Sequence, residues 1–121
     1  MPRILYIEDL DDNATLVDRI LTGRGYGFSR ASNAEEGLEM ALSEPPDLIL
    51  LDLGLPDVDG QTLSIWLRSE EALQKIPIIA LTAWPEEVAR KMVEQYQLDG
   101  YLGKPFNIHR LLEMIESLLA R

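Results

Sequence analysis

The sequence contains no cysteine and only one histidine, His109, among its 121 residues. These absences exclude a zinc finger, an iron–sulfur site, a thiol nucleophile and a histidine-rich metal site. Basic residues are also few, with 11 Lys and Arg against 21 Asp and Glu, which gives a formal net charge of −10. This acidic balance argues against nucleic acid and anionic membranes as partners, and it favours cations and basic protein surfaces.

Long apolar runs are absent as well. No stretch approaches the ~20 apolar residues that a membrane span needs, and residues 1–12 lack the basic-then-apolar plan of a signal peptide. We therefore expect a cytoplasmic protein without membrane contact. Apolar periodicity continues almost unbroken to Leu119, which predicts a single domain over residues 1–121.

Short continuous apolar runs alternate with segments of helical periodicity along the chain. Continuous runs are typical of parallel strands that are buried on both faces. The alternation predicts an α/β fold, a doubly wound five-stranded parallel sheet with right-handed crossovers and helices on both faces. The predicted strands are Ile4–Ile7, Gly27–Ala31, Leu48–Leu51, Ile76–Leu81 and Gly100–Leu102.

Five helices are predicted between these strands, because apolar residues recur there at helical spacing. The last two helices are expected at Glu86–Tyr96 and Ile108–Ala120. Start signals are Asn33 with Glu36 three residues later, Pro85 in a first turn, and Asn107 as an N-cap. The first three helices are expected to bury three stripes, namely Leu16, Val17, Ile20 and Leu21; Leu38, Met40, Ala41 and Leu42; and Leu63, Ile65, Trp66 and Leu67.

Polar residues follow the predicted strands at their carboxyl ends, where ligands bind in doubly wound sheets. We expect Glu8, Asp9, Asp52, Thr82 and Lys104 to meet at this edge. Three carboxylates in one place repel one another, and a Mg²⁺ ion together with Lys104 would offset that repulsion. This set of groups suits phosphoryl transfer, with Asp52 as the nucleophile toward phosphorus.

These residues resemble the receiver domain of two-component response regulators, of the single-domain type found among chemotaxis regulators. The resemblance extends from Ile4 to Leu119, with 30 residues from Asp52 to Thr82 and 22 from Thr82 to Lys104. It implies a flavodoxin-like sheet with the strand order 2-1-3-4-5. The matching motifs are Glu8-Asp9, Asp52 in LILLDLGLPDVDG, Thr82 in LTA, and Lys104 in YLGKPF.

The resemblance also implies the chemistry. A histidine kinase or a histidine phosphotransfer protein would phosphorylate Asp52 in a Mg²⁺-dependent reaction, and hydrolysis would reverse it. Asp9, Asp52 and the backbone carbonyl of Gly54 would bind the metal. Glu8 would reach the metal directly or through water, since the family more commonly has Asp at this position.

The resemblance assigns further roles to residues that follow the fourth and fifth strands. Thr82 would bond the bound phosphoryl group, Lys104 would pair with it, and Tyr101 would turn inward on activation. The bond between Lys104 and Pro105 is expected to be cis, since that bend aims the lysine at the site. Trp84 flanks the phosphorylation site at a position that influences hydrolysis of the acyl phosphate.

The expected output is protein binding rather than turnover of an external substrate or direct binding of nucleic acid. A phosphoryl group of about −1.5 to −2 charge would bias a two-state surface formed by the fourth helix, fifth strand and last helix. A downstream target protein would bind there, and a homodimer through the last helix stays open. The residues expected on this surface are Arg90, Lys91, Glu94, Tyr101, His109 and Arg110.

Three alternatives compete with this interpretation. A phosphatase of the haloacid dehalogenase type also uses an Asp nucleophile, but it needs a second Asp two residues later, where this chain has Gly54. A degenerate receiver acting as a scaffold or dimerisation module is disfavoured, because Asp52, Thr82 and Lys104 are all retained. A receiver cut from a hybrid kinase or a multidomain regulator would have other partners but the same chemistry.

Overall fold

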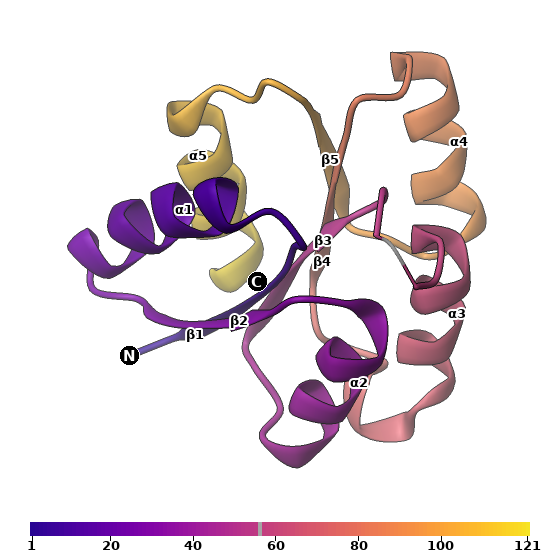
Figure 1. Cartoon of the computed structure of the whole chain (residues 1–121), viewed down its shortest axis with the longest axis horizontal. Helices are drawn as coiled ribbons and strands as arrows, with labels where there is room; N and C mark the ends of the chain where they lie inside the picture. The colour runs from indigo at the N-terminus through magenta and orange to yellow at the C-terminus, as the bar shows by residue number, and fades with distance from the viewer. Residues whose placement is uncertain (56) are drawn as a thin grey trace.

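The computed structural model describes residues 1–55 and 57–121. In this part of the chain the β-strands form one parallel sheet with the order β2-β1-β3-β4-β5 (Figure 1). This arrangement confirms the predicted flavodoxin-like sheet and its strand order. The strands are β1 (Arg3–Ile7), β2 (Gly27–Ala31), β3 (Leu48–Asp52), β4 (Ile78–Thr82) and β5 (Gly100–Gly103).

An α-helix follows each strand, and a short 3-10 helix that the sequence did not predict follows the third α-helix. Among the described residues, none of the helices is both long enough and apolar enough to cross a bilayer. The helices are α1 (Asp11–Gly23), α2 (Ala34–Ser43), α3 (Gly60–Ser69), the 3-10 helix η1 (Glu71–Leu73), α4 (Glu86–Gln95) and α5 (Ile108–Leu119).

The sheet has a buried core on each face. Helices α1 and α5 pack on one face, and α2, α3 and α4 cover the other (Figure 1). Since successive strand side chains point to opposite faces, Leu48 and Leu50 join the core beneath α1 and α5, whereas Ile49 and Leu51 join the other core. Burial on both faces explains why the central strands are continuous apolar runs in the sequence.

The first three helices bury small residues as well as large ones, and most of the small ones lie outside the predicted stripes. A Cβ atom at Gly60, for example, would lie 2.9 Å from the Cα atom of Leu53, so a longer side chain does not fit there. Predicted core residues such as Val17 and Leu63 are fully buried, whereas other large apolar side chains of these helices point to solvent. The predicted core positions Leu16, Leu42, Ile65 and Trp66 are therefore wrong, with exposures of 49%, 40%, 55% and 38%. The buried small residues include Ala14, Ala34, Gly37, Ala41, Gly60 and Ser64.

Two corrections to the predicted elements involve proline, while the other predicted strand and helix ends are exact or differ by one residue. Strand β4 begins at Ile78 rather than at Ile76. Pro77 has no N–H group for the ladder, and the Ile76 N–H bonds to the Leu73 carbonyl in the turn after η1. Pro85 is the N-cap residue before α4 instead of a member of its first turn.

The two predicted asparagine caps are confirmed. The Asn33 side chain accepts the N–H of Glu36 at the start of α2. The Asn107 side chain accepts the N–H groups of His109 and Arg110 at the start of α5. Each cap satisfies donors that the first helical turn leaves without intrahelical partners.

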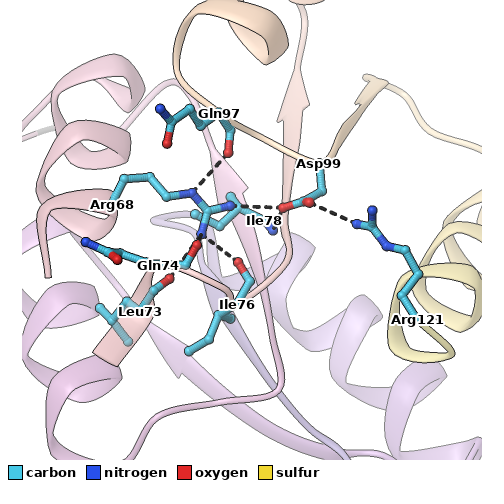
Figure 2. Close-up of polar contacts among 8 residues, drawn as sticks. All are labelled: Arg68, Leu73, Gln74, Ile76, Ile78, Gln97, Asp99 and Arg121. Carbon is cyan, nitrogen blue, oxygen red and sulfur yellow. Dashed lines mark hydrogen bonds and ion pairs between the residues drawn. The ribbon is translucent and has the colours of Figure 1, made fainter. Parts of the chain in front are cut away.

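Arg68, near the end of α3, joins the segments that lead into β4 and β5 (Figure 2). The Asp99 carboxylate accepts from Arg68 at 2.9 Å, from the N–H of Ile78 at 2.8 Å and from Arg121 at 2.9 Å. This network holds α3, η1 and the amino ends of two strands together. The guanidinium group of Arg68 also donates to the main-chain carbonyls of Leu73, Gln74, Ile76 and Gln97, at 2.8–3.2 Å.

We predict that Arg68→Lys lowers the free energy of unfolding by about 1–3 kcal/mol, because lysine keeps the charge but loses the planar set of donors. Urea denaturation measures this change. Arg19→Lys on the exposed surface of α1 is the matched control, with an expected change below about 0.5 kcal/mol. Equal stabilities of the two variants would contradict the prediction.

Candidate functional site

Four of the predicted site residues lie at the carboxyl ends of neighbouring strands. Asp52 and Thr82 are the last residues of β3 and β4, and Glu8 and Lys104 directly follow β1 and β5. Three of these polar side chains are buried, since Glu8 is 0%, Asp52 5% and Thr82 2% exposed. Parallel pairing places these strand ends at one edge of the sheet, so the expected cluster is formed.

Lys104 supplies the positive charge of this cluster. Its Nζ atom lies 3.0 Å from Asp52 Oδ1 and 3.7 Å from Glu8 Oε1. The same Asp52 oxygen accepts the N–H of Gly54 at 3.0 Å. These two donors on Oδ1 fix the orientation of the Asp52 carboxylate, and neither of them bonds to its Oδ2 atom.

Glu8 is held through both its main chain and its side chain. Its N–H donates to the carbonyl of Ala31 at 3.0 Å, and its carbonyl accepts from Nε of Arg30 at 3.0 Å. Its Oε1 atom accepts from Nδ2 of Asn13 at 2.6 Å. The Oε2 atom is buried and has no hydrogen-bond partner among the described residues, so this acceptor is unsatisfied within the described chain.

Glu8, Asp9 and Asp52 form an acidic cluster in which one carboxylate oxygen from each lies within 4.8 Å of the others. One lysine cannot balance three carboxylates, so the cluster carries excess negative charge when ionised. Carboxylate oxygens are the donors that hard divalent cations such as Mg²⁺ prefer. The donor set, together with the unsatisfied oxygen of Glu8, therefore fits a bound divalent cation.

The crowding of these acids separates their pKa values. The pKa of Glu8 is raised to about 7, first by burial and then by a hydrogen bond shared with Asp52. Burial alone would also raise the pKa of Asp52, but hydrogen bonds from Glu8, the Gly54 N–H and Lys104 outweigh burial and lower it. In the metal-free protein, a proton on this pair of acids therefore binds to Glu8 in preference to Asp52.

Thr82 connects the cluster to the loops that follow β4 and β5. Its Oγ1 atom accepts the N–H of Trp84 at 2.9 Å, and its carbonyl accepts the N–H of Lys104 at 2.7 Å. The bond between Lys104 and Pro105 is cis, as predicted. A movement of Thr82 would therefore be transmitted to both loops through these two hydrogen bonds.

Tyr101 lies in β5 between the cluster and the surface of α4. Its side chain is half-buried, and its hydroxyl group donates to Oε1 of Glu86 at 3.3 Å. The same oxygen accepts from Arg90 at 3.1 Å. Next to Tyr101 is a groove lined by residues that include Thr82, Trp84, Val93, Arg110 and Met114. The residues predicted for the output surface are exposed, namely Arg90, Lys91, Glu94, His109 and Arg110.

The sequence alone did not reveal three residues that support the cluster. Asn13 lies in the first turn of α1, and its contact with Glu8 depends on the orientation of that helix, so no sequence signal indicated it. Arg30 lies opposite Tyr6 in the pairing of β1 and β2, which becomes visible only when the register is known. Asp57 accepts the first two N–H groups of α2 at 2.9 and 3.1 Å and so holds the loop after β3 against that helix.

Comparison with known proteins now identifies the family. The model of the response regulator receiver domain matches residues 4–116. The chain belongs to this family. It is 34% identical over 120 residues to the polar-differentiation response regulator DivK of Brucella anthropi, and the match covers 98% of each chain.

Two solved structures of receiver proteins show the same fold. A putative response regulator from Chloroflexus aurantiacus matches with a TM-score of 0.93 and 32% identity, over 99% of this chain and 98% of the other. The receiver domain of the sensor histidine kinase PA1611 from Pseudomonas aeruginosa matches with a TM-score of 0.90 and 29% identity, over 99% and 98%. That domain holds a magnesium ion in its active-site cleft.

The family confirms the resemblance drawn from the sequence motifs. Response regulator receiver domains are signalling proteins of two-component systems. Glu8, Asp9 and Asp52 form the acidic cluster of this chain.

We predict that the metal-free protein loses stability as the pH rises from about 5 to 8. The folded-state pKa of Glu8, about 7, lies above its ordinary value of 4.5, so its contribution is complete below pH 4.5 and is lost as Glu8 ionises. The loss is on the order of 1–3 kcal/mol. Urea denaturation in the presence of a chelator, at several pH values and constant ionic strength, measures it.

Glu8→Gln should flatten this dependence, because glutamine cannot ionise. Glu39→Gln, which removes one charge from the exposed surface of α2, is the matched control and should leave the dependence unchanged. Parallel pH profiles for wild type and Glu8→Gln would show that the stability loss originates elsewhere in the acidic chain.

Proposed function

We propose that this receiver domain accepts a phosphoryl group on Asp52 from a histidine kinase or a histidine phosphotransfer protein, with Mg²⁺ bound, and signals through phosphorylation-controlled protein binding. The observation that carries the proposal is the state of Asp52, a buried carboxylate at a strand end. It stays ionised beside a lysine because Lys104 and the Gly54 N–H both bond to its Oδ1 atom.

Asp52 fits the role of nucleophile better than its two acidic neighbours. A carboxylate must be ionised to attack phosphorus, and the low pKa of Asp52 favours this state whereas the raised pKa of Glu8 opposes it. An Asp52 oxygen would form the new bond to phosphorus as the bond from phosphorus to the donor nitrogen breaks. The electron pair of that bond leaves with the imidazole of the donor histidine.

Glu8, Asp9, Asp52 and the backbone carbonyl of Gly54 are the proposed metal ligands. A bound Mg²⁺ ion would neutralise negative charge on the carboxylates and on the equatorial phosphoryl oxygens. The acidic cluster supports this assignment for the three side chains. Glu8 would lose its proton to become a ligand, while Asn13 keeps its Oε1 atom oriented.

Lys104 and Thr82 would receive the phosphoryl group. Lys104 already contacts Asp52, so its ammonium group can pair with an added phosphoryl oxygen. Thr82 would exchange its present bond with the Trp84 N–H for a hydroxyl bond to the phosphoryl group. Its movement would clear space beside Tyr101, which would then leave Glu86 and turn inward.

A target protein would bind the altered surface of α4, β5 and α5. The inward turn of Tyr101 would break its bond to Glu86, and Arg90 would then be the remaining donor of these two to the Glu86 carboxylate. In this proposal the domain spans residues 1–121 and turns over no external substrate. A scaffold without phosphoryl chemistry would not need an ionised Asp52.

We predict that acetyl phosphate adds one phosphoryl mass to the wild-type protein only when Mg²⁺ is present. Asp52→Asn should abolish the adduct, because the amide is not nucleophilic. Intact-protein mass spectrometry measures both results. Asp18→Asn on α1 is the matched control and should keep the adduct. A full adduct on the Asp52→Asn variant would contradict the proposal.

We predict that Thr82→Ala keeps the adduct but loses the phosphorylation-induced change in Trp84 fluorescence. Alanine has no hydroxyl group, so phosphorylation cannot break a bond between residue 82 and the main-chain N–H of Trp84. Thr82→Ser should keep both. The experiment uses a Trp66→Phe background, so that Trp84 is the only tryptophan. A fluorescence change of equal size in Thr82→Ala would show that Thr82 does not transmit the signal.

A further inference from the structure

Tyr6 is the one fully buried tyrosine among the described residues, and the proposed chemistry leaves its hydroxyl group without a role. It lies in β1 on the face covered by α1 and α5, with 0% exposure. Its ring contacts Phe28 edge-to-face, with centroids 6.5 Å apart. Packing would be served equally by phenylalanine, and the hydroxyl has no hydrogen-bond partner in the described chain. A buried hydroxyl of this kind is unfavourable unless it is used.

Glu8 contains the complementary unsatisfied atom. Residues two apart along an extended chain point to the same side, so Tyr6 and Glu8 share the face of the sheet beneath α1. The contact of Glu8 with Asn13 of α1 agrees with this placement. Its Oε1 atom is occupied by Asn13 and its Oε2 atom is buried without a partner.

The two groups also influence each other electrostatically. The pKa of Tyr6 is raised, first by burial and then by the nearby charge of Glu8. The phenol is therefore a neutral donor, and the Glu8 carboxylate, once ionised to bind a metal, is solely an acceptor. The Tyr6 hydroxyl group, a donor without an acceptor, and Glu8 Oε2, an acceptor without a donor, are thus both buried on the same face of the sheet.

The length of the Glu8 side chain gives this pair a role. Glutamate has one more rotatable bond than aspartate, so its carboxylate needs an additional contact to be held in one position. Asn13 fixes one oxygen, and a phenol donor would fix the other. Groups that orient metal ligands in this way contribute strongly to metal affinity.

We infer that Tyr6 is a positioning residue for Glu8, whose hydroxyl group donates to the Glu8 carboxylate and orients it toward the bound Mg²⁺ ion. This inference rests on the proposed function, because it assumes that Glu8 is part of the Mg²⁺ site. Tyr6 touches neither the phosphoryl group nor Asp52 in this proposal and acts only through Glu8.

The test is a calorimetric titration of the protein with MgCl₂ at pH 7.5. We expect Tyr6→Phe to weaken Mg²⁺ binding about tenfold, while the aromatic ring still packs against Phe28. Tyr26→Phe, the same change at a half-buried tyrosine, is the matched control and should bind Mg²⁺ as wild type does.

A second background separates positioning from packing. In Glu8→Asp the carboxylate is one methylene shorter and lies beyond the reach of the phenol, so adding Tyr6→Phe should cause no further loss of Mg²⁺ affinity. An equal loss in both backgrounds would overturn the inference in favour of a packing effect, and an unchanged affinity in Tyr6→Phe alone would overturn it directly. Failure of the wild-type protein to bind Mg²⁺ would instead overturn the proposed function, and the inference with it.

Discussion

The repulsion among the carboxylates of Glu8, Asp9 and Asp52 is the constraint on which the rest of the site depends. Parallel pairing forces the ends of β1 and β3 together, so these acids cannot separate without breaking the sheet. Lys104 offsets part of the charge, and a proton on Glu8 offsets more. The metal-free site is therefore more stable with this proton bound than without it. In the proposed function a divalent cation would replace that proton, which would couple metal binding to the ionisation of Glu8.

The same short segments that balance this charge also lead to the surface. Lys104 bonds to Asp52 through its side chain and to the Thr82 carbonyl through its main chain. Thr82 in turn holds the N–H of Trp84 through its hydroxyl group. In the proposed function, a phosphoryl group on Asp52 would add negative charge where both Lys104 and Thr82 can respond. Because these residues lie at the start of the loops before α4 and α5, a local electrostatic change would reach the α4, β5 and α5 surface without rearrangement of the sheet.

The sequence predicted most of the site because the strand ends converge by topology. Asp52, Thr82 and Lys104 each follow an apolar run, so their proximity needed only the sheet order. Asn13 and Arg30 could not be found in this way, since their contacts with Glu8 depend on helix orientation and strand register. The wrong prediction that Trp66 is buried has a different cause. Apolar periodicity correctly marked Leu63 and Leu67 of α3, but it passed over Gly60 and Ser64, which are buried where Trp66 is not.

Charged groups are arranged differently at the two ends of the sheet. At the amino ends, Arg68 and Asp99 bond to each other and to main-chain groups of η1, β4 and the loop before β5 (Figure 2). At the carboxyl ends, three clustered carboxylates face one lysine, and the buried atoms Tyr6 Oη and Glu8 Oε2 lack partners among the described residues. A fully satisfied network has nothing to gain from a ligand, whereas an under-satisfied one gains from every cation or donor that arrives. Confining the imbalance to one edge thus keeps the scaffold rigid while leaving the site responsive to metal and phosphate.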